Sequence, residues 1–147
     1  MALLLASDIR VDIRIDATPM GSILITSGSF AGGLGMEGFD VASKATQEMY
    51  QTTLPCSISV EQVPQSPDTM RLMNIIRAKA NRQHPNHAEF RSAVIDVEFI
   101  ADFAEEGRAR ALMSNCMVTG GDLAFQGGNA RTSQPLTFTA PDWRYRT

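Results

Sequence analysis

The stretch DIRVDIRID at residues 8–16 decides the fold, because apolar β-branched residues alternate in it with charged residues without interruption. Successive side chains of a strand point to opposite faces of a sheet, so this period of two is typical of a half-buried strand. Acids and arginines also alternate along the polar face. Exposed ion pairs contribute only about 0–1 kcal/mol each, but such a row can pair with a neighbouring strand or subunit.

The last third of the chain continues this strand pattern. Apolar residues alternate again over 94–103, residues 105–107 (Glu-Glu-Gly) favour a hairpin, and one strand is expected from 108 to about 118. Shorter strands separated by Gly, Pro and Asn turns are predicted at 23–26, 56–61, 123–125 and 136–139, the last of them closing the fold.

One helix interrupts the strands. Ser66 suits the N-cap, Pro67 the first helical position, and Asp68 the positive end of the helix dipole. Apolar residues then recur at spacings of three and four, and Pro85 lies in the loop that follows. The pattern predicts a helix to about Asn81 with an apolar face made by Leu72, Met73, Ile75, Ile76 and Ala80.

Two segments lack this periodicity. Residues 28–38 are rich in glycine, which favours a flexible or bulged sheet connection, although residues 39–42 alternate like a strand. Residues 43–53 are polar and contain Lys44, Gln47, Glu48 and Tyr50. We interpret this second stretch as a long loop that leaves the domain, and loops of that length are usually functional or disordered.

These elements predict a mostly β (α+β) fold. The 147 residues suit one domain, residues 1–147, and no internal repeat or linker divides them. Six or seven short strands and one helix indicate two packed antiparallel sheets that form a barrel or sandwich with one flanking α-helix.

Composition limits the function. The formal net charge is −3 and the pI is about 5.3, which argues against a protein that grips nucleic acid over its surface. No window reaches the roughly 18 apolar residues of a membrane span, and the start of the chain lacks the basic region of a signal peptide. We expect no membrane partner and two free, partly buried thiols in a reducing cytoplasm.

Several chemical motifs are present without their usual context. Residues 33–38 match G-x-G-x-x-G, but no βαβ unit follows to hold a dinucleotide. Cys56, Cys116, His84 and His87 could form a Cys2His2 zinc site, but neither cysteine lies in a C-x-x-C pair. We therefore expect no cofactor and no metal.

Catalytic readings are equally weak. Cys116 could be a nucleophile, but its apolar neighbours favour a small buried hydrophobic residue. Glu105 and Glu106 lie at a hairpin tip, where carboxylates are usually solvated. We expect no catalytic residue and no enzymatic activity.

Both ends of the chain carry residues that a monomer would leave exposed. Leu3, Leu4 and Leu5 are apolar, and Trp143, Tyr145 and their arginine neighbours belong to the types enriched at interface hot spots. A tail that folds onto its own domain is the alternative.

The order of these signals resembles the tail tube subunits of contractile-tailed phages and the related tubes of secretion systems. The likeness lies in the N-terminal alternating strand, the segment at 57–72 where a strand leads into a capped helix, the hairpin return at 107–116, and the end of the chain from 127–130 to 136–140. It covers most of the chain and depends on order and spacing.

The resemblance implies a subunit of hexameric rings that stack into a hollow tube, through which DNA passes without specific binding. Partners would be further copies, the tail sheath, the baseplate hub and terminator proteins. The protein would be made in the bacterial host cytoplasm and reside in the virion tail. Expected inter-subunit contacts are Leu3, Leu4, Leu5, Lys44, Gln47, Glu48, Tyr50, Trp143 and Tyr145.

Other functions stay open at this level. The tube of a contractile secretion or injection system and a tail terminator ring would share the architecture. A small enzyme that uses Cys116 or the glycine-rich segment, and a monomeric barrel that binds a ligand in an internal pocket, belong to different classes.

Overall fold

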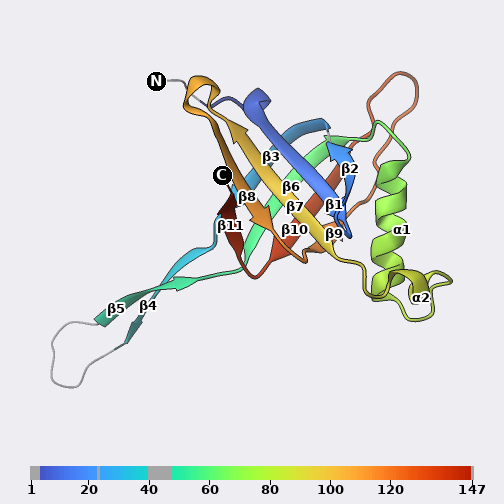
Figure 1. The fold of residues 1–147 in the computed structure, drawn as a ribbon. Coiled ribbons are helices and arrows are strands. Elements are labelled where there is room, and N and C mark those ends of the chain that lie inside the picture. Colours follow the sequence, from blue (N-terminus) through green and yellow to red (C-terminus); the bar gives the residue numbers. More distant parts are fainter. Residues whose placement is uncertain (1–3, 23, 40–47, 147) are drawn as a thin grey trace.

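The computed structural model describes residues 4–22, 24–39 and 48–146. Its larger sheet, which we call sheet A, has five antiparallel strands in the order β11-β8-β7-β1-β2 (Figure 1). Short 3-10 turns at Ala6–Asp8 (η1) and Ala104–Glu106 (η2) lie before β1 and between β7 and β8. The strands are β1 Ile9–Ile15, β2 Thr18–Ser22, β7 Ile95–Asp102, β8 Arg108–Met113 and β11 Trp143–Arg146.

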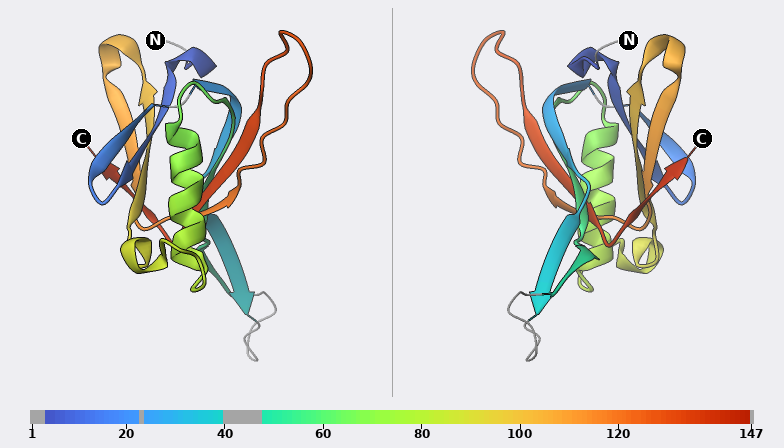
Figure 2. Two further views of the ribbon diagram at one scale, coloured as in Figure 1. Left: turned by 90° about the vertical axis from the view of Figure 1, so that its right-hand side faces the viewer. Right: turned by 90° about the vertical axis from the view of Figure 1, so that its left-hand side faces the viewer.

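The second sheet, sheet B, has four antiparallel strands in the order β3-β6-β10-β9. A bulge interrupts the pairing of β3 with β6 between Ile25 and Ser27. The strands are β3 Leu24–Ala31, β6 Cys56–Val63, β9 Met117–Gly120 and β10 Gln134–Ala140. Sheets A and B share one core, and the predicted fold of two packed antiparallel sheets with a flanking helix is confirmed as a sandwich (Figures 1 and 2).

The alternation that opened the sequence places the core. Val11, Ile13 and Ile15 of β1 are buried, while the charged residues between them face away from sheet B. The apolar positions of β7 meet them in direct register, with Val97 opposite Ile13. From sheet B, the inward side chains of β6 and β10 complete the core with Ile58, Val60, Leu136 and Phe138.

Helix α1, Asp68–Ala80, lies along one open side of the sandwich, and the short α2, His87–Phe90, follows it (Figure 2). Leu72 and Ile75 enter the core as predicted, but the third buried position is Ala78, whereas Ala80 is exposed. The predicted cap was one residue too early, because Pro67 occupies the N-cap. The Ser66 hydroxyl still accepts a hydrogen bond from the Asp68 amide, at 3.2 Å.

The predicted long loop is partly wrong. Residues 48–53 are a strand, β5 (Glu48–Thr53), which pairs antiparallel with β4 (Leu34–Phe39). The two form a ribbon that projects from the sandwich (Figure 1). At its base Gly33 has a φ of +74°, and a side chain there would collide with the Leu54 carbonyl oxygen, so glycine is required. The G-x-G-x-x-G motif therefore belongs to a corner and a strand.

Two further strand predictions need correction. The strand expected over 108–118 is divided: β8 ends at Met113, Asn115 adopts a φ of +52°, and β9 begins in the other sheet. Residues 123–125 form only an isolated bridge, between Ala124 and Ser133. The strand over 136–139 is present within β10, but β11 follows it and closes sheet A beside β8.

Buried polar groups tie distant strands together. Glu98 of β7 is only 4% exposed, on the face of sheet A that points away from the core. Its carboxylate accepts a hydrogen bond from Arg146 at 2.7 Å and pairs with Arg110 at 3.7 Å. In sheet B, the Gln62 amide donates to Gln134 at 2.6 Å. The Glu98 contacts hold β11 in place beside β8, and the Gln62–Gln134 hydrogen bond fixes the register of β6 against β10.

Replacing Arg146 with methionine should lower the free energy of unfolding by about 1–3 kcal/mol, because it removes the shorter charged hydrogen bond to a buried carboxylate. Arg144→Met is the matched control, since Arg144 lies on the same face of β11 and is exposed. Urea unfolding monitored by circular dichroism measures both. Equal losses in the two variants would contradict a special role for the Glu98 pair.

Candidate assembly surfaces

Sheet B has two edge strands that, among the described residues, pair on one side only: β3 pairs with β6, and β9 with β10. An unpaired edge presents backbone donors and acceptors to a further strand. Three antiparallel steps separate β3 from β9, so the two edges run in opposite directions. Copies related by rotation would therefore join β9 to β3 in antiparallel fashion, which continues the pattern of the sheet.

Sheet A differs in this respect. Its five strands are joined by four antiparallel steps, so its edges β11 and β2 run in the same direction. Rotated copies joined through these edges would meet in parallel, which breaks the antiparallel pattern. Sheet B is thus the better candidate for continuation between copies.

The free face of sheet B is rich in hydroxyl groups. Its residues alternate along β3, β6, β9 and β10 with those that enter the core. The hydroxyls of Ser59 on β6 and Thr137 on the adjacent β10 are 3.3 Å apart. One carboxylate, Glu61, is the charged group of β6 on this face. The hydroxyl residues are Ser27, Ser29, Ser57, Ser59, Thr119, Thr137 and Thr139.

The free face of sheet A is instead strongly charged. The charged residues of β1 lie opposite those of β7, for example Asp12 opposite Glu98 and Arg14 opposite Asp96. Arginines predominate toward β8 and β11, where Arg110 lies opposite Arg146. This face carries Arg10, Asp12, Arg14, Asp96, Glu98, Asp102, Arg108, Arg110, Arg144 and Arg146.

The β4–β5 ribbon has two unlike faces. Directly opposed residues share a face, so Leu34, Met36 and Met49 lie together; Leu34 and Met36 are 78% and 66% exposed. On the other face the Tyr50 hydroxyl donates to the Glu37 carboxylate at 2.6 Å. This hydrogen bond and, less strongly, desolvation raise the pKa of Tyr50. An isolated two-stranded ribbon is marginally stable in water, so an exposed apolar face points to a partner.

The predicted contact residues fall in three separate places. Leu4 and Leu5 are exposed at the start of the chain, while Glu48 and Tyr50 lie on the ribbon. Tyr145 is exposed on β11. The structure does not bring these groups together within one subunit. Leu3, Lys44 and Gln47 lie outside the described residues.

Trp143 has contacts within its own chain. Its indole nitrogen donates to the Gly32 carbonyl oxygen at 3.1 Å, and its ring meets Phe30 edge-on with centroids 5.6 Å apart. Phe30 in turn stacks on Phe99 at 5.0 Å. Trp143 therefore anchors the end of the chain across both sheets, whatever further contact it makes.

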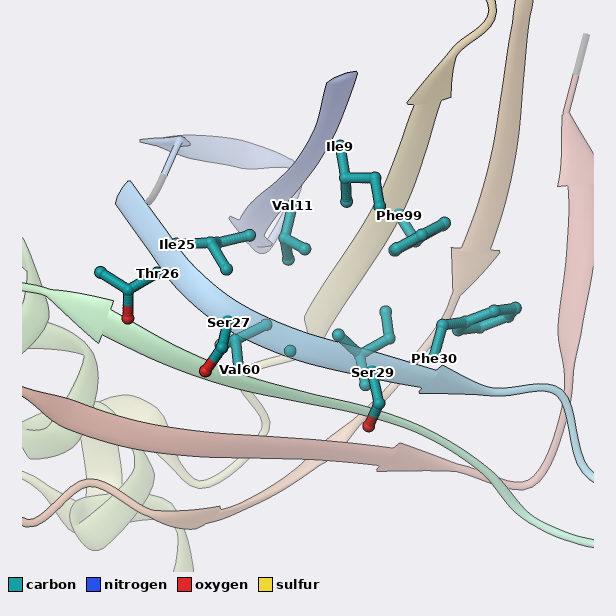
Figure 3. Close-up of a pocket in the computed structure, with 11 residues that line it drawn as sticks. Ile9, Val11, Ile25, Thr26, Ser27, Ser29, Phe30, Val60 and Phe99 are labelled. Atoms are coloured by element: carbon teal, nitrogen blue, oxygen red, sulfur yellow. The ribbon is translucent and has the colours of Figure 1, made fainter. Parts of the chain in front are cut away.

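An apolar cavity of about 180 Å³ opens beside β3 (Figure 3). Val11 and Phe99 line it from sheet A, and Ile25, Phe30 and Val60 line it from sheet B. Figure 3 shows the hydroxyls of Ser27 and Ser29 directed away from this space. Small-molecule sites usually have volumes of roughly 300–1,000 Å³ and convergent polar groups, and this cavity falls short on both counts.

The candidate catalytic and metal residues lie apart or buried. Burial raises the pKa of the Cys116 thiol to about 12 and also raises that of Cys56. His87 hydrogen-bonds the Ala78 carbonyl oxygen through Nδ1 at 2.7 Å, and His84 accepts from the Asn86 amide. Within the described residues, no cluster of three or more His, Cys, Asp or Glu side chains could hold a metal ion.

Over the described part of the chain, no helix has both the length and the apolar character needed to cross a bilayer.

Comparison with solved structures gives matches over nearly the whole chain. A chain of the sheath–tube complex of an extracellular contractile injection system (PVC) has a TM-score of 0.63 and 13% identity, covering 99% of this chain and 92% of that one. A chain of the tube-terminating cap of the anti-feeding prophage (AFP) has a TM-score of 0.58 and 13% identity, with 100% and 93% covered. The SPP1 tail tube has a TM-score of 0.58 and 11% identity, with 98% and 79% covered.

No protein-family model and no curated protein sequence matches this chain. The matched structures belong to phage tail tubes and contractile injection systems, and they are structural tube components. The chain therefore has the tail tube fold that its sequence resembles. At 11–13% identity, these matches show the fold alone.

Sequence reasoning missed the two faces of the ribbon. A usable signal was present, because Leu34 and Met36 alternate with Gly35 and Glu37 in the period of a strand. The high glycine content of residues 28–38 obscured it, since glycine is depleted in strands.

Both thiols should resist alkylation in the folded protein. A pKa raised from 9.0 to about 12 cuts the thiolate fraction of Cys116 at pH 8 roughly a thousandfold, and the thiolate is the reactive form. Iodoacetamide labelling followed by intact mass spectrometry should find no adduct on the native chain and two adducts in guanidinium chloride. Rapid labelling of native Cys116 would revive the thiol-enzyme alternative.

Proposed function

We propose that this chain is the subunit of hexameric rings that stack into the hollow tube of a phage tail. The observation that carries this proposal is that the described residues leave two oppositely directed edges of sheet B unpaired, in a fold shared with tube proteins. A head-to-tail interface closes into a ring when its rotation divides a full turn. Joining β9 to β3 around six copies leaves no edge of sheet B exposed.

The sandwich architecture favours one orientation of the ring. Sheet A packs on one face of sheet B, so the bulk of the subunit belongs at the larger radius. The free face of sheet B then lines the lumen. Its hydroxyl groups can stay hydrated and carry little charge, whereas the arginine-rich face of sheet A would hold DNA phosphates.

This arrangement suits passage of DNA without specific binding. Binding to DNA depends on clustered Lys and Arg that release counterions, and the proposed lumen face offers hydroxyls and Glu61 instead. The acid adds a repulsive charge that keeps a passing polyanion mobile. The work of the protein is then mechanical, and no reaction is required of it.

The other surfaces supply contacts with partners. The ribbon reaches beyond the sandwich and contacts the next ring through its apolar face and, on its other face, through Glu48 and Tyr50. Leu4, Leu5, Trp143 and Tyr145 lie at chain ends that contact adjacent subunits. Sheath, baseplate hub and terminator proteins meet the outside and the two ends of the tube. The protein is made in the host cytoplasm and resides in the virion tail.

A second candidate is the tube of a contractile injection system or a ring that terminates such a tube. The sheath–tube complex and the tube-terminating cap among the similar structures favour it. A terminator would form one ring and stop, whereas a tube subunit would continue to stack.

A pair of cysteines across the proposed edge contact tests ring formation. Thr119→Cys on β9 combined with Ser27→Cys or Ser29→Cys on β3 should give a ladder of disulfide-linked species that ends at six subunits. The native thiols are buried and do not interfere. Non-reducing electrophoresis and negative-stain microscopy of the purified protein read the result.

The matched control replaces Thr137 instead of Thr119. Thr137 lies directly opposite Thr119 on the same face, but it belongs to the central strand β10. Thr137→Cys with Ser29→Cys should give no ladder. A wild-type protein that stays monomeric at high concentration, or a pair that never cross-links within visible rings, would refute the proposed edge contact.

A further inference from the structure

The connection from β9 to β10 is a long, exposed loop over residues 121–133 (Figure 1). Its base is closed by paired backbone hydrogen bonds between Ala124 and Ser133, at 2.9 and 3.0 Å. Phe125 follows directly and is 78% exposed. A loop of this length in a compact domain is usually functional, and a large aromatic residue held out in water is costly for a monomer.

A hollow lies near the opposite end of the same sheet. Its volume is about 550 Å³, and its walls come from the residue before β6, the end of β10, the turn between β8 and β9, the first residue of β9 and the last turn of α1. Met117 in this wall is 74% exposed. Most of the lining surface is apolar, with Pro55, Met117, Ala140 and Pro141 among the lining residues, and Ser114, Asn115 and Thr139 add polar groups.

The loop and the hollow lie toward opposite ends of the sandwich. In Figure 1 the loop between β9 and β10 rises at the upper right of the sandwich, to about the height of the turn between β7 and β8, and the first residues of β6 and the last of β10 lie at the lower end of the sandwich. Figure 2 shows the loop at the same end of the sandwich as the turn between β7 and β8, from two further sides. Ala124 is bridged to Ser133 just before β10 begins, and the hollow lies where β10 ends, so the seven residues of β10 separate Phe125 from the hollow of its own subunit. A copy displaced along β10 can bring the two together.

We propose that Phe125 of each subunit inserts into the hollow of a second copy of this chain in the adjacent ring. An apolar cavity of roughly 150 Å³ already accepts benzene, so the hollow has room for a phenyl ring and part of the loop. The loop carries Asp122 and Arg131, and the hollow has Lys79 in its wall with Asp142 next to Pro141, so each site offers an acid and a base that can pair with the other site. An aromatic side chain in an apolar pocket is the usual form of an interface hot spot.

This inference rests on the proposed function and names a side-chain contact between stacked rings, which is distinct from the backbone pairing of β9 with β3 within a ring. The contact is head-to-tail, because each copy offers the loop at one end and the hollow at the other. Such a contact repeats without closure and gives a filament.

Two variants interrupt the contact from its two sides. Phe125→Ser removes the aromatic ring, and Ser114→Trp fills the hollow from an exposed position in its wall. Both changes lie outside the core, so both proteins should keep wild-type melting temperatures. Negative-stain microscopy should show tubes for the wild type and single rings for each variant, with Phe125→Leu restoring tubes in part.

Mixing the two variants gives a sharper outcome. A Phe125→Ser ring keeps its hollow, and a Ser114→Trp ring keeps its Phe125, so one productive junction can form between them. The mixture should contain pairs of stacked rings and no longer tubes. Analytical ultracentrifugation measures this as a species with twice the mass of one ring.

The outcomes separate the two proposals. Tubes of unchanged length from Phe125→Ser, or a mixture that remains single rings, would overturn the Phe125 contact while ring formation stands. A wild-type protein without rings would overturn the proposed function and this contact with it.

Discussion

Within the described part of the chain, the backbone of β3 and of β9 is paired on one side only, and the rest of this molecule depends on that constraint. Sheet B buries one face against sheet A, and a four-stranded sheet without closure must leave two edges. Soluble proteins usually blunt such edges with charge, proline or a covering segment. Here β9 is short, and the bulge at residues 25–27 bends β3, but the row of hydroxyls beside them offers no strong repulsion. Because sheet B has an even number of antiparallel strands, its two edges run in opposite directions. One edge can therefore pair in antiparallel fashion with the other edge of a second copy.

The ribbon and the charged face of sheet A follow the same logic. A two-stranded ribbon has little stability alone. The Tyr50–Glu37 hydrogen bond and the backbone hydrogen bond from Leu54 to Gly33 at its base hold the ribbon in a fixed conformation before a partner binds. Preforming the ribbon lowers the entropy lost on association. On sheet A, Arg110 and Arg146 both pair with the buried carboxylate of Glu98, which neutralises part of the positive charge of this face within the subunit. The two faces of the sandwich thus differ in what they can bind.

The sequence predicts those parts of the fold that depend on local periodicity. DIRVDIRID became β1 with its apolar side buried, and the helix ends within one residue of its predicted end. Features that depend on distant strands were missed. Glu98 looks like one more solvent-facing acid until β8 and β11 bring arginines over it, and the crossing at Asn115 is set by the need to enter sheet B. The strand at residues 48–53 was missed for two reasons: the segment itself is polar, and its partner β4 contains two glycines, which are depleted in strands. The contact role predicted for the chain ends is a property of an assembly and has no signature in one subunit.

The strength of the proposed stacking contact makes sense only for whole rings. Burying one phenylalanine side chain contributes about 1.5–3 kcal/mol, which is less than the roughly 4–15 kcal/mol that two free bodies lose on association. Two single subunits would therefore not stay stacked through Phe125. A ring presents all of its loops at once, and the translational and rotational loss occurs once for the whole ring while the apolar contacts add. Stacking then follows ring closure, and free subunits are kept from forming irregular filaments before the edges of sheet B are paired. The order of assembly is thus built into a weak axial contact and a cooperative lateral one.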